Sequence, residues 1–164
     1  MWRLFPRGTL PASHILRSGE RQMTDAALIL GVLLAGGWDL ARRKIPNWLT
    51  FGLMGLGLVM GFIAGGLEGL VDSLQGLLLG GALLFIPFLL GGMGAGDVKL
   101  LAAIGALKGP LFVLWAFLYG ALAGGVLAVG ALLVGKYFFF RPKTIPYGVA
   151  LMVGAFAALY GGGI

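Results

Sequence analysis

Residues 48–66 read WLTFGLMGLGLVMGFIAGG, a run that contains no charged side chain. A helix needs roughly 20 consecutive apolar residues to cross the hydrocarbon core of a bilayer. This stretch is long enough for one crossing, and it predicts a membrane-spanning helix.

The composition of the whole chain supports a membrane location. Of its 164 residues, 59% are hydrophobic and 11% are charged, whereas a soluble domain carries about 25% charged residues. A soluble fold of this length could not bury so much apolar surface, but lipid can cover it. Glycine occurs 31 times, as is common in membrane helices whose backbones approach closely. We expect an integral membrane protein.

Further apolar segments flank the first one on both sides. They comprise residues 26–40, 74–92, 97–107, 111–135 and 145–160. The segment 97–107 is shorter than a full span, and Lys108-Gly109-Pro110 breaks the pattern after it. The sequence therefore predicts an all-α integral membrane protein with about six transmembrane helices in one bundle. We expect this polytopic membrane domain to comprise residues 23–164.

Residues 1–22 differ from the rest of the chain. They hold four arginines and two prolines but no continuous apolar run, so they do not form a signal peptide. Met23 directly precedes the first apolar segment. We expect residues 1–22 to be either a cationic N-terminal tail or a start-site artefact, with Met23 as the true start.

The placement of basic residues predicts the orientation. Three basic residues lie at 42–44 and three more lie between 136 and 143, whereas Glu68 and Asp72 are the charges between the second and third segments. Cytoplasmic loops carry an excess of Lys and Arg, so the first, third and fifth loops are expected in the cytoplasm. The arginines of residues 1–22 would then lie outside, which also favours Met23 as the start. We expect a multi-pass protein of the inner (cytoplasmic) membrane.

Several kinds of chemistry are excluded or made improbable by composition. The chain has no cysteine, and His14 is its single histidine, which argues against thiol catalysis, a Ser-His system and a Cys- or His-rich metal site. The net charge of +6 comes from short clusters between apolar runs, typical of membrane anchors and not of a nucleic-acid surface. Carboxylate chemistry without a metal or cofactor is what remains.

Two of the six carboxylates, Asp39 and Asp97, lie at the edges of apolar segments. An ionisable group at a membrane segment is costly and indicates a functional site. Asp39 could instead pair with the basic run after it, and Asp97 could cap a helix. Gly92, Gly94 and Gly96 precede Asp97 and leave space beside its carboxylate.

Two carboxylates brought together can share one proton. The ionised member takes a proton from water, and the protonated member polarises the scissile carbonyl, as in aspartic proteases. For Asp39 and Asp97 this requires the first and fourth helices to pack side by side at the cytoplasmic surface.

Three motifs resemble one known family. Gly94-Ala95-Gly96-Asp97 matches the G-x-G-D signature of membrane aspartyl proteases, and Val98-Lys99 extends it as in the prepilin peptidases. Asp39, the basic run and Ile45-Pro46-Asn47 resemble the first motif of that family, and Pro146-Tyr147-Gly148 resembles its third. Over residues 24–160 the chain thus resembles the prepilin peptidases, or type IV leader peptidases.

The resemblance implies a function and a set of site residues. Asp39 and Asp97 are expected to be catalytic, and the substrate is expected to be a prepilin or pseudopilin in the lipid bilayer, cut after its basic leader on the cytoplasmic side. The residues expected to bind substrate or shape the site are Gly94, Gly96, Lys99, Pro46, Asn47, Pro146, Tyr147 and Gly148. Plainer interpretations are a snorkelling anchor for Lys99 and turn formation for the prolines and Gly148.

The chain departs from longer, bifunctional members of that family. Those members carry a cytoplasmic region with paired cysteines and also methylate the new N-terminus, whereas this chain has no cysteine. It is similar to the short form found with Flp-type (tight-adherence) pili and in some archaeal systems. We therefore expect peptidase activity without N-methylation.

Two alternatives stay open. A presenilin-like intramembrane protease shares the G-x-G-D signature, although its first motif is usually Tyr-Asp and here is Trp38-Asp39. A small proton- or cation-coupled transporter could also use paired aspartates. Neighbouring pilin-like genes would favour the peptidase, whereas uptake that needs both aspartates would favour the transporter.

Overall fold

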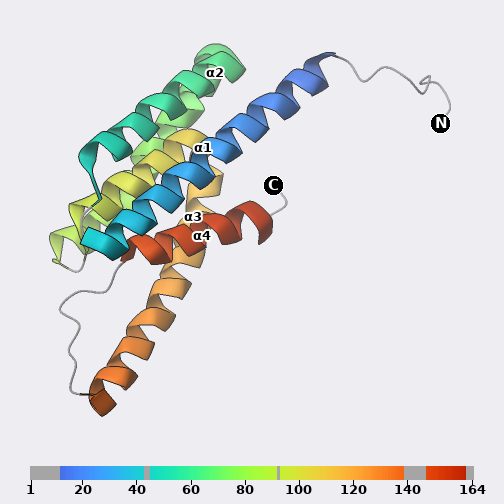
Figure 1. The fold of residues 1–164 in the computed structure, drawn as a ribbon. Coiled ribbons are helices and arrows are strands. Elements are labelled where there is room, and N and C mark those ends of the chain that lie inside the picture. Colours follow the sequence, from blue (N-terminus) through green and yellow to red (C-terminus); the bar gives the residue numbers. More distant parts are fainter. Residues whose placement is uncertain (1–11, 43–44, 92, 139–146, 162–164) are drawn as a thin grey trace, which may run out of the picture.

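The computed structural model describes residues 12–42, 45–91, 93–138 and 147–161. These residues form four helices and no strand: α1 (Ala12–Arg42), α2 (Asn47–Leu89), α3 (Ala95–Phe138) and α4 (Tyr147–Gly161). The all-α prediction is confirmed for this part of the chain. Figure 1 shows the four helices packed around one another.

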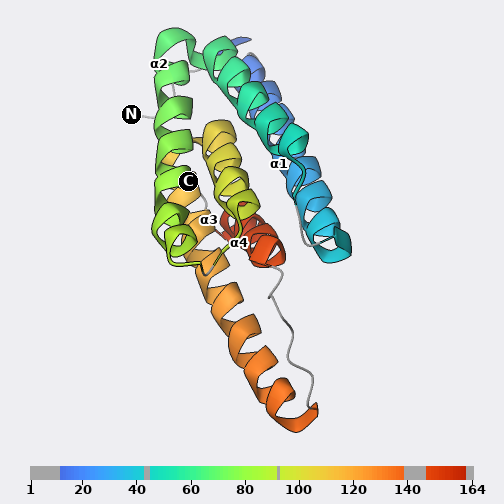
Figure 2. The ribbon, with the colours of Figure 1, turned by 90° about the vertical axis from the view of Figure 1, so that its left-hand side faces the viewer.

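Helices α2 and α3 are each interrupted at one glycine. Gly66 has φ 60° and ψ −134°, and Gly109 has φ 82° and ψ 177°, a region that favours glycine because it lacks a Cβ. Figures 1 and 2 show that each helix folds back on itself there. We call the parts before and after each break its first arm and second arm.

The two breaks compare differently with the predicted boundaries. The break at Gly109 falls within the predicted Lys108-Gly109-Pro110 interruption. After Gly66, however, the helix resumes at once, so Glu68 and Asp72 lie within the second arm of α2 and not in a loop. A single glycine makes the turn at each break, Gly66 in α2 and Gly109 in α3, which explains why the six predicted segments appear as four helices.

Helix α1 begins earlier than predicted, at Ala12 and not near residue 26. The polar residues before position 26 belong to the same helix, because charged and polar residues are compatible with helical structure. Residues 1–11 lie outside the described residues, and the domain boundary at Met23 stays a prediction.

Two helices are long and apolar enough to cross a membrane by length and composition: Asn47–Leu89 and the part Ala95–Val126 of α3. Large apolar side chains also cover the outside of the bundle, including those of Trp48, Ile63 and Leu90, which are 66%, 68% and 82% exposed. Apolar surface of this extent is unusual for a soluble monomer, and lipid accommodates it.

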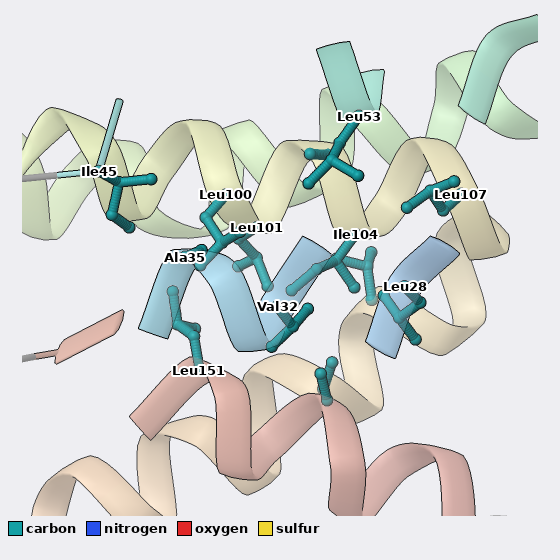
Figure 3. Close-up of a cluster of buried hydrophobic side chains, with 14 of the residues drawn as sticks. Leu28, Val32, Ala35, Ile45, Leu53, Leu100, Leu101, Ile104, Leu107 and Leu151 are labelled. Atoms are coloured by element: carbon teal, nitrogen blue, oxygen red, sulfur yellow. The ribbon is translucent and has the colours of Figure 1, made fainter. Parts of the chain in front are cut away.

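The buried core lies where α1, α3 and α4 meet. Val32 and Ala35 of α1 face Leu101 and Ile104 in the first arm of α3, and Leu151 of α4 closes the cluster (Figure 3). All five side chains are almost fully buried. This cluster packs α1, the first arm of α3 and α4 against one another.

Small residues let the arms of α2 and α3 touch through their backbones. A Cβ placed on Gly105 would overlap the carbonyl oxygen of Gly76, and one placed on Gly76 would overlap that of Gly105. Close backbone approach through glycine is typical of membrane helices. At the far end of the first arm of α3, Lys108 pairs with Asp25 of α1, and its Nζ lies 5.6 Å from the centre of the Phe112 ring.

Candidate active site

Asp39 and Asp97 lie close together although they are 58 positions apart in the sequence. Asp39 lies in the last turns of α1, and Asp97 lies in the first turn of α3. Each is only 8% exposed, and their carboxylates are within electrostatic range of each other. The predicted packing of these two helix ends is therefore present, while the catalytic role of the pair stays a prediction.

The start of α3 orients the carboxylate of Asp97. The amide nitrogen of Gly94 donates a hydrogen bond to Oδ2 of Asp97 over 3.2 Å, and the Asp97 amide donates to the Gly94 carbonyl over 3.1 Å. A side chain in the first helical turn that binds back to the residue before the helix is the geometry of a capping box. The capping role and a chemical role of Asp97 are thus compatible.

The start of α4 holds the carboxylate of Asp39. The amide nitrogen of Gly148 donates a buried hydrogen bond to Oδ2 of Asp39 over 3.0 Å. Free N–H groups and the helix dipole make a helix N-terminus favourable for a carboxylate. A Cβ on Gly148 would lie 2.8 Å from this oxygen, so glycine is required for the approach.

The other two residues of the third motif are described incompletely. Tyr147 is the first residue of α4, but the position of its side chain lies outside the described part. Pro146 lies entirely outside the described residues. Gly148 is therefore the residue of the third motif whose contact with Asp39 is described.

The connection between α1 and α2 packs against the start of α3. The Cβ of Ile45 lies 3.2 Å from the place that a Cβ of Gly96 would occupy, and Ile45 is 8% exposed. Pro46 precedes α2, and its carbonyl accepts hydrogen bonds from the amides of Leu49 and Thr50. Ile45 was not among the predicted site residues. Its position in the first motif, directly before Pro46 and Asn47, could have indicated it.

Lys99 and Asn47, both predicted site residues, contact each other. Nζ of Lys99 donates a hydrogen bond to Oδ1 of Asn47 over 2.9 Å, and it lies 5.1 Å from the centre of the Phe51 ring. No ion pair joins Lys99 to Asp97, both of which are described fully. Phe51 was not among the predicted site residues, although it follows Asn47 by one helical turn.

Aromatic side chains connect α1 and α2 beside the aspartates. The rings of Trp38 and Trp48 make an edge-to-face contact with centres 6.4 Å apart. The guanidinium of Arg42 lies 5.2 Å from the centre of the Trp38 ring. The contact between Trp38 and Trp48 joins the end of α1 to the start of α2, whereas Arg42 and Trp38 are both on α1.

The chemistry available at this site is that of a carboxylate pair. Within the described ranges, no three His, Cys, Asp or Glu side chains gather as metal ligands would. The prediction that neither metal nor cofactor takes part stays a prediction. Two buried carboxylates at short range can share a proton and activate water.

Comparison with known proteins places these residues in context. Residues 26–129 match the profile of the type IV leader peptidase family. A prepilin leader peptidase/N-methyltransferase of Aeromonas hydrophila is 34% identical over 148 residues, which covers 85% of this chain and 50% of that protein. A protein of the same name from Xanthomonas campestris pv. campestris is 33% identical over 167 residues, covering 93% and 55%.

The chain thus spans about half the length of the curated relatives it matches. The matched family region contains both Asp39 and Asp97. No solved structure matches the chain.

Proposed function

Because the chain belongs to the type IV leader peptidase family, we propose that it is a membrane aspartyl endopeptidase that removes the basic leader from type IV pilin-like precursors. The observation that carries the proposal is the pair of buried aspartates brought together from α1 and α3. Family membership favours this function over the transporter and presenilin-like alternatives.

The aspartate pair would hydrolyse the peptide bond in two stages. The ionised carboxylate takes a proton from water as the water oxygen attacks the scissile carbonyl, and the protonated carboxyl group hydrogen-bonds the carbonyl oxygen. When the tetrahedral intermediate collapses, the C–N bond breaks and the leaving amine receives a proton. The hydroxyl group from water remains on the new carboxyl terminus, so the balance needs no further reactant.

Backbone amides would keep the two carboxylates oriented through this cycle. Oδ2 of Asp39 is bonded by the amide of Gly148, and Oδ2 of Asp97 by that of Gly94. Each carboxylate thus has a second oxygen that these two amides do not occupy. Such fixed donors reduce the reorganisation required when charge moves between the two groups.

We propose that α1, both arms of α2, both arms of α3 and α4 cross the bilayer, with the aspartates at the cytoplasmic face. Basic residues support this orientation, because Arg42 ends the helix that carries Asp39 and Arg43 and Lys44 come next in the sequence. Glu68 and Asp72 lie near the break of α2, at the other end of its arms. This distribution follows the positive-inside tendency.

The proposed substrate has chemistry that matches this placement. A leader with several Lys or Arg residues would remain at the cytoplasmic surface, and the apolar helix after it would lie in the bilayer beside the enzyme. The bond between them would then reach the depth of Asp39 and Asp97, which lie at helix ends. We further propose that this chain cleaves without methylating the product, because it has no cysteine and the bifunctional members that it resembles are expected to carry paired cysteines.

Cleavage of a defined precursor tests the proposal. The chain is co-expressed with a type IV or Flp-type prepilin, and mass spectrometry identifies the new N-terminus of the product. We expect one cut between the basic leader and the apolar helix. A folded chain that cuts none of several prepilins would contradict the proposal and favour proton-coupled transport, which flux assays in liposomes would then measure.

A further inference from the structure

Lys99 lies two positions after Asp97, and the contacts of its ammonium group are with α2. Its ammonium group donates to Oδ1 of Asn47 at 2.9 Å and lies 5.1 Å from the centre of the Phe51 ring. Asn47 and Phe51 are one turn apart on the first arm of α2, so one side chain of α3 contacts two points on that arm. Attraction between an ammonium group and an aromatic ring adds to the hydrogen bond.

The contact lies at the residue where the chain enters α2. Asn47 is the first residue of α2 and follows Arg42, the last residue of α1, by a short connection. Ile45 within this connection already packs on Gly96 of α3. Two successive contacts, from Ile45 and from Asn47, therefore hold the α1–α2 connection against the first turns of α3.

This arrangement links the two aspartates mechanically. Asp39 lies three residues before the end of α1, and Asp97 lies in the first turn of α3. Trp48, next to Asn47, makes an edge-to-face contact with Trp38, next to Asp39, so movement of the start of α2 away from α3 would also act on the end of α1. Misplacement of a catalytic group by about 1 Å can lower a rate by about a hundredfold.

We propose that Lys99 is a positioning residue that, through its contact with Asn47 and Phe51, holds the α1–α2 connection on α3 and so maintains the spacing of Asp39 and Asp97. The proposal rests on the proposed peptidase function for its kinetic consequence. It assigns Lys99 no contact with the substrate or with the reacting atoms. Loss of the contact should therefore lower kcat and leave KM unchanged.

A double-mutant cycle on prepilin cleavage tests this assignment. Lys99→Met removes the donor with little change in length, and Asn47→Ala removes the acceptor. We expect each single variant and the double variant to lower kcat by about tenfold, because loss of one charge-assisted hydrogen bond breaks the same link in all three. Asn47→Asp, which retains an acceptor oxygen, should restore most of the rate.

Two kinetic outcomes would overturn the proposal. Additive losses, or a rise in KM with constant kcat, would show that Lys99 acts on the substrate independently of Asn47. Unchanged rates in all variants would show that Lys99 does not position the aspartates and acts only as a snorkelling anchor at the surface. Lys108→Met is the matched control, because Lys108 lies on the same arm, also lies over a phenylalanine ring and also has a polar partner. It is about 14 Å further along the helix, and this variant should retain kcat.

A distance measurement tests the same link without any cleavage assay. The chain has no cysteine, so cysteines introduced at Ala41 and Ala95, both exposed, take spin labels selectively. We expect electron-resonance distances between them to be narrowly distributed in the wild type and broadened by Lys99→Met and by Asn47→Ala, but not by Lys108→Met. An unchanged distribution in the first two variants would overturn the proposal even if the chain cleaved no prepilin, whereas broadening with no cleavage would contradict only the proposed function.

Discussion

The amide nitrogen of Gly148 donates a hydrogen bond over 3.0 Å to Oδ2 of Asp39, which joins the start of α4 to the end of α1. The two residues are 109 positions apart in the chain. A carboxylate buried to 8% exposure requires such a partner, because an unpaired buried charge is costly. Helix α4 therefore contributes to the site through its backbone.

Substitution of Gly148 by alanine should impair cleavage. The new Cβ would lie 2.8 Å from Oδ2 and 3.1 Å from Cβ of Asp39, so either the carboxylate or the start of α4 must move. We expect kcat/KM to fall by about tenfold to a hundredfold. Gly37→Ala is the control, since Gly37 is on the same helix as Asp39 but faces open space. Equal activity of both variants would contradict the positioning of Asp39 by α4.

Packing of α2 on α3 through Gly105 should control stability. A Cβ on Gly105 would overlap the carbonyl of Gly76, so Gly105→Ala must separate the two arms. We expect a loss of about 1–3 kcal/mol in the free energy of unfolding, as for other overpacked sites. Thermal unfolding in detergent measures this loss. Gly55→Ala, which faces open space, should be neutral or slightly stabilising, and a similar effect of both changes would show that the arms do not touch at Gly105.

The ion pair of Asp25 and Lys108 should affect stability but not catalysis. It joins α1 to the break of α3, at side chains that are 36% and 16% exposed. We expect Asp25→Asn to cost about 1 kcal/mol or less, because solvent screens such a pair. Thermal unfolding at low and high salt reports this contribution. A large fall in kcat for the folded protein would contradict the separation of this pair from the aspartate site.

The new N-terminus of the cleaved pilin should carry no methyl group. The curated relatives are named for both a peptidase and an N-methyltransferase activity, and this chain lacks the paired cysteines expected of bifunctional members. The product mass after cleavage in the presence of a methyl donor distinguishes the two cases. A mass increase of one methyl group that depends on this chain would contradict the proposal of cleavage alone.

Much of the helical content was predictable because apolar runs and glycine-proline breaks are local signals. The interruption at Lys108-Gly109-Pro110 is present at Gly109. The continuation of helix through Glu68 and Asp72 was not predicted, because charged residues between apolar runs resemble a loop in the sequence although they are compatible with helix.

The candidate site residues could be selected from the sequence, but their contacts could not, and their roles stay predictions. Asp39 and Asp97 could be selected because charges at apolar segments are rare. The contacts of Asp39 with Gly148 and of Lys99 with Asn47 join residues distant in sequence. They depend on how helices pack, and no local pattern in one sequence specifies that packing. The motif residues therefore indicated a site before its geometry was known.

The most direct test of the central claim compares prepilin cleavage by the wild type with that by Asp39→Asn and by Asp97→Asn. Asparagine preserves the shape of each side chain but removes the shared proton and the base. We predict that the wild type and the control Glu68→Gln, whose carboxylate is exposed on α2, cleave fully, while each aspartate variant loses activity by about a thousandfold or more. Cleavage that persists in a folded Asp39→Asn or Asp97→Asn variant would contradict the aspartate pair as the catalytic centre.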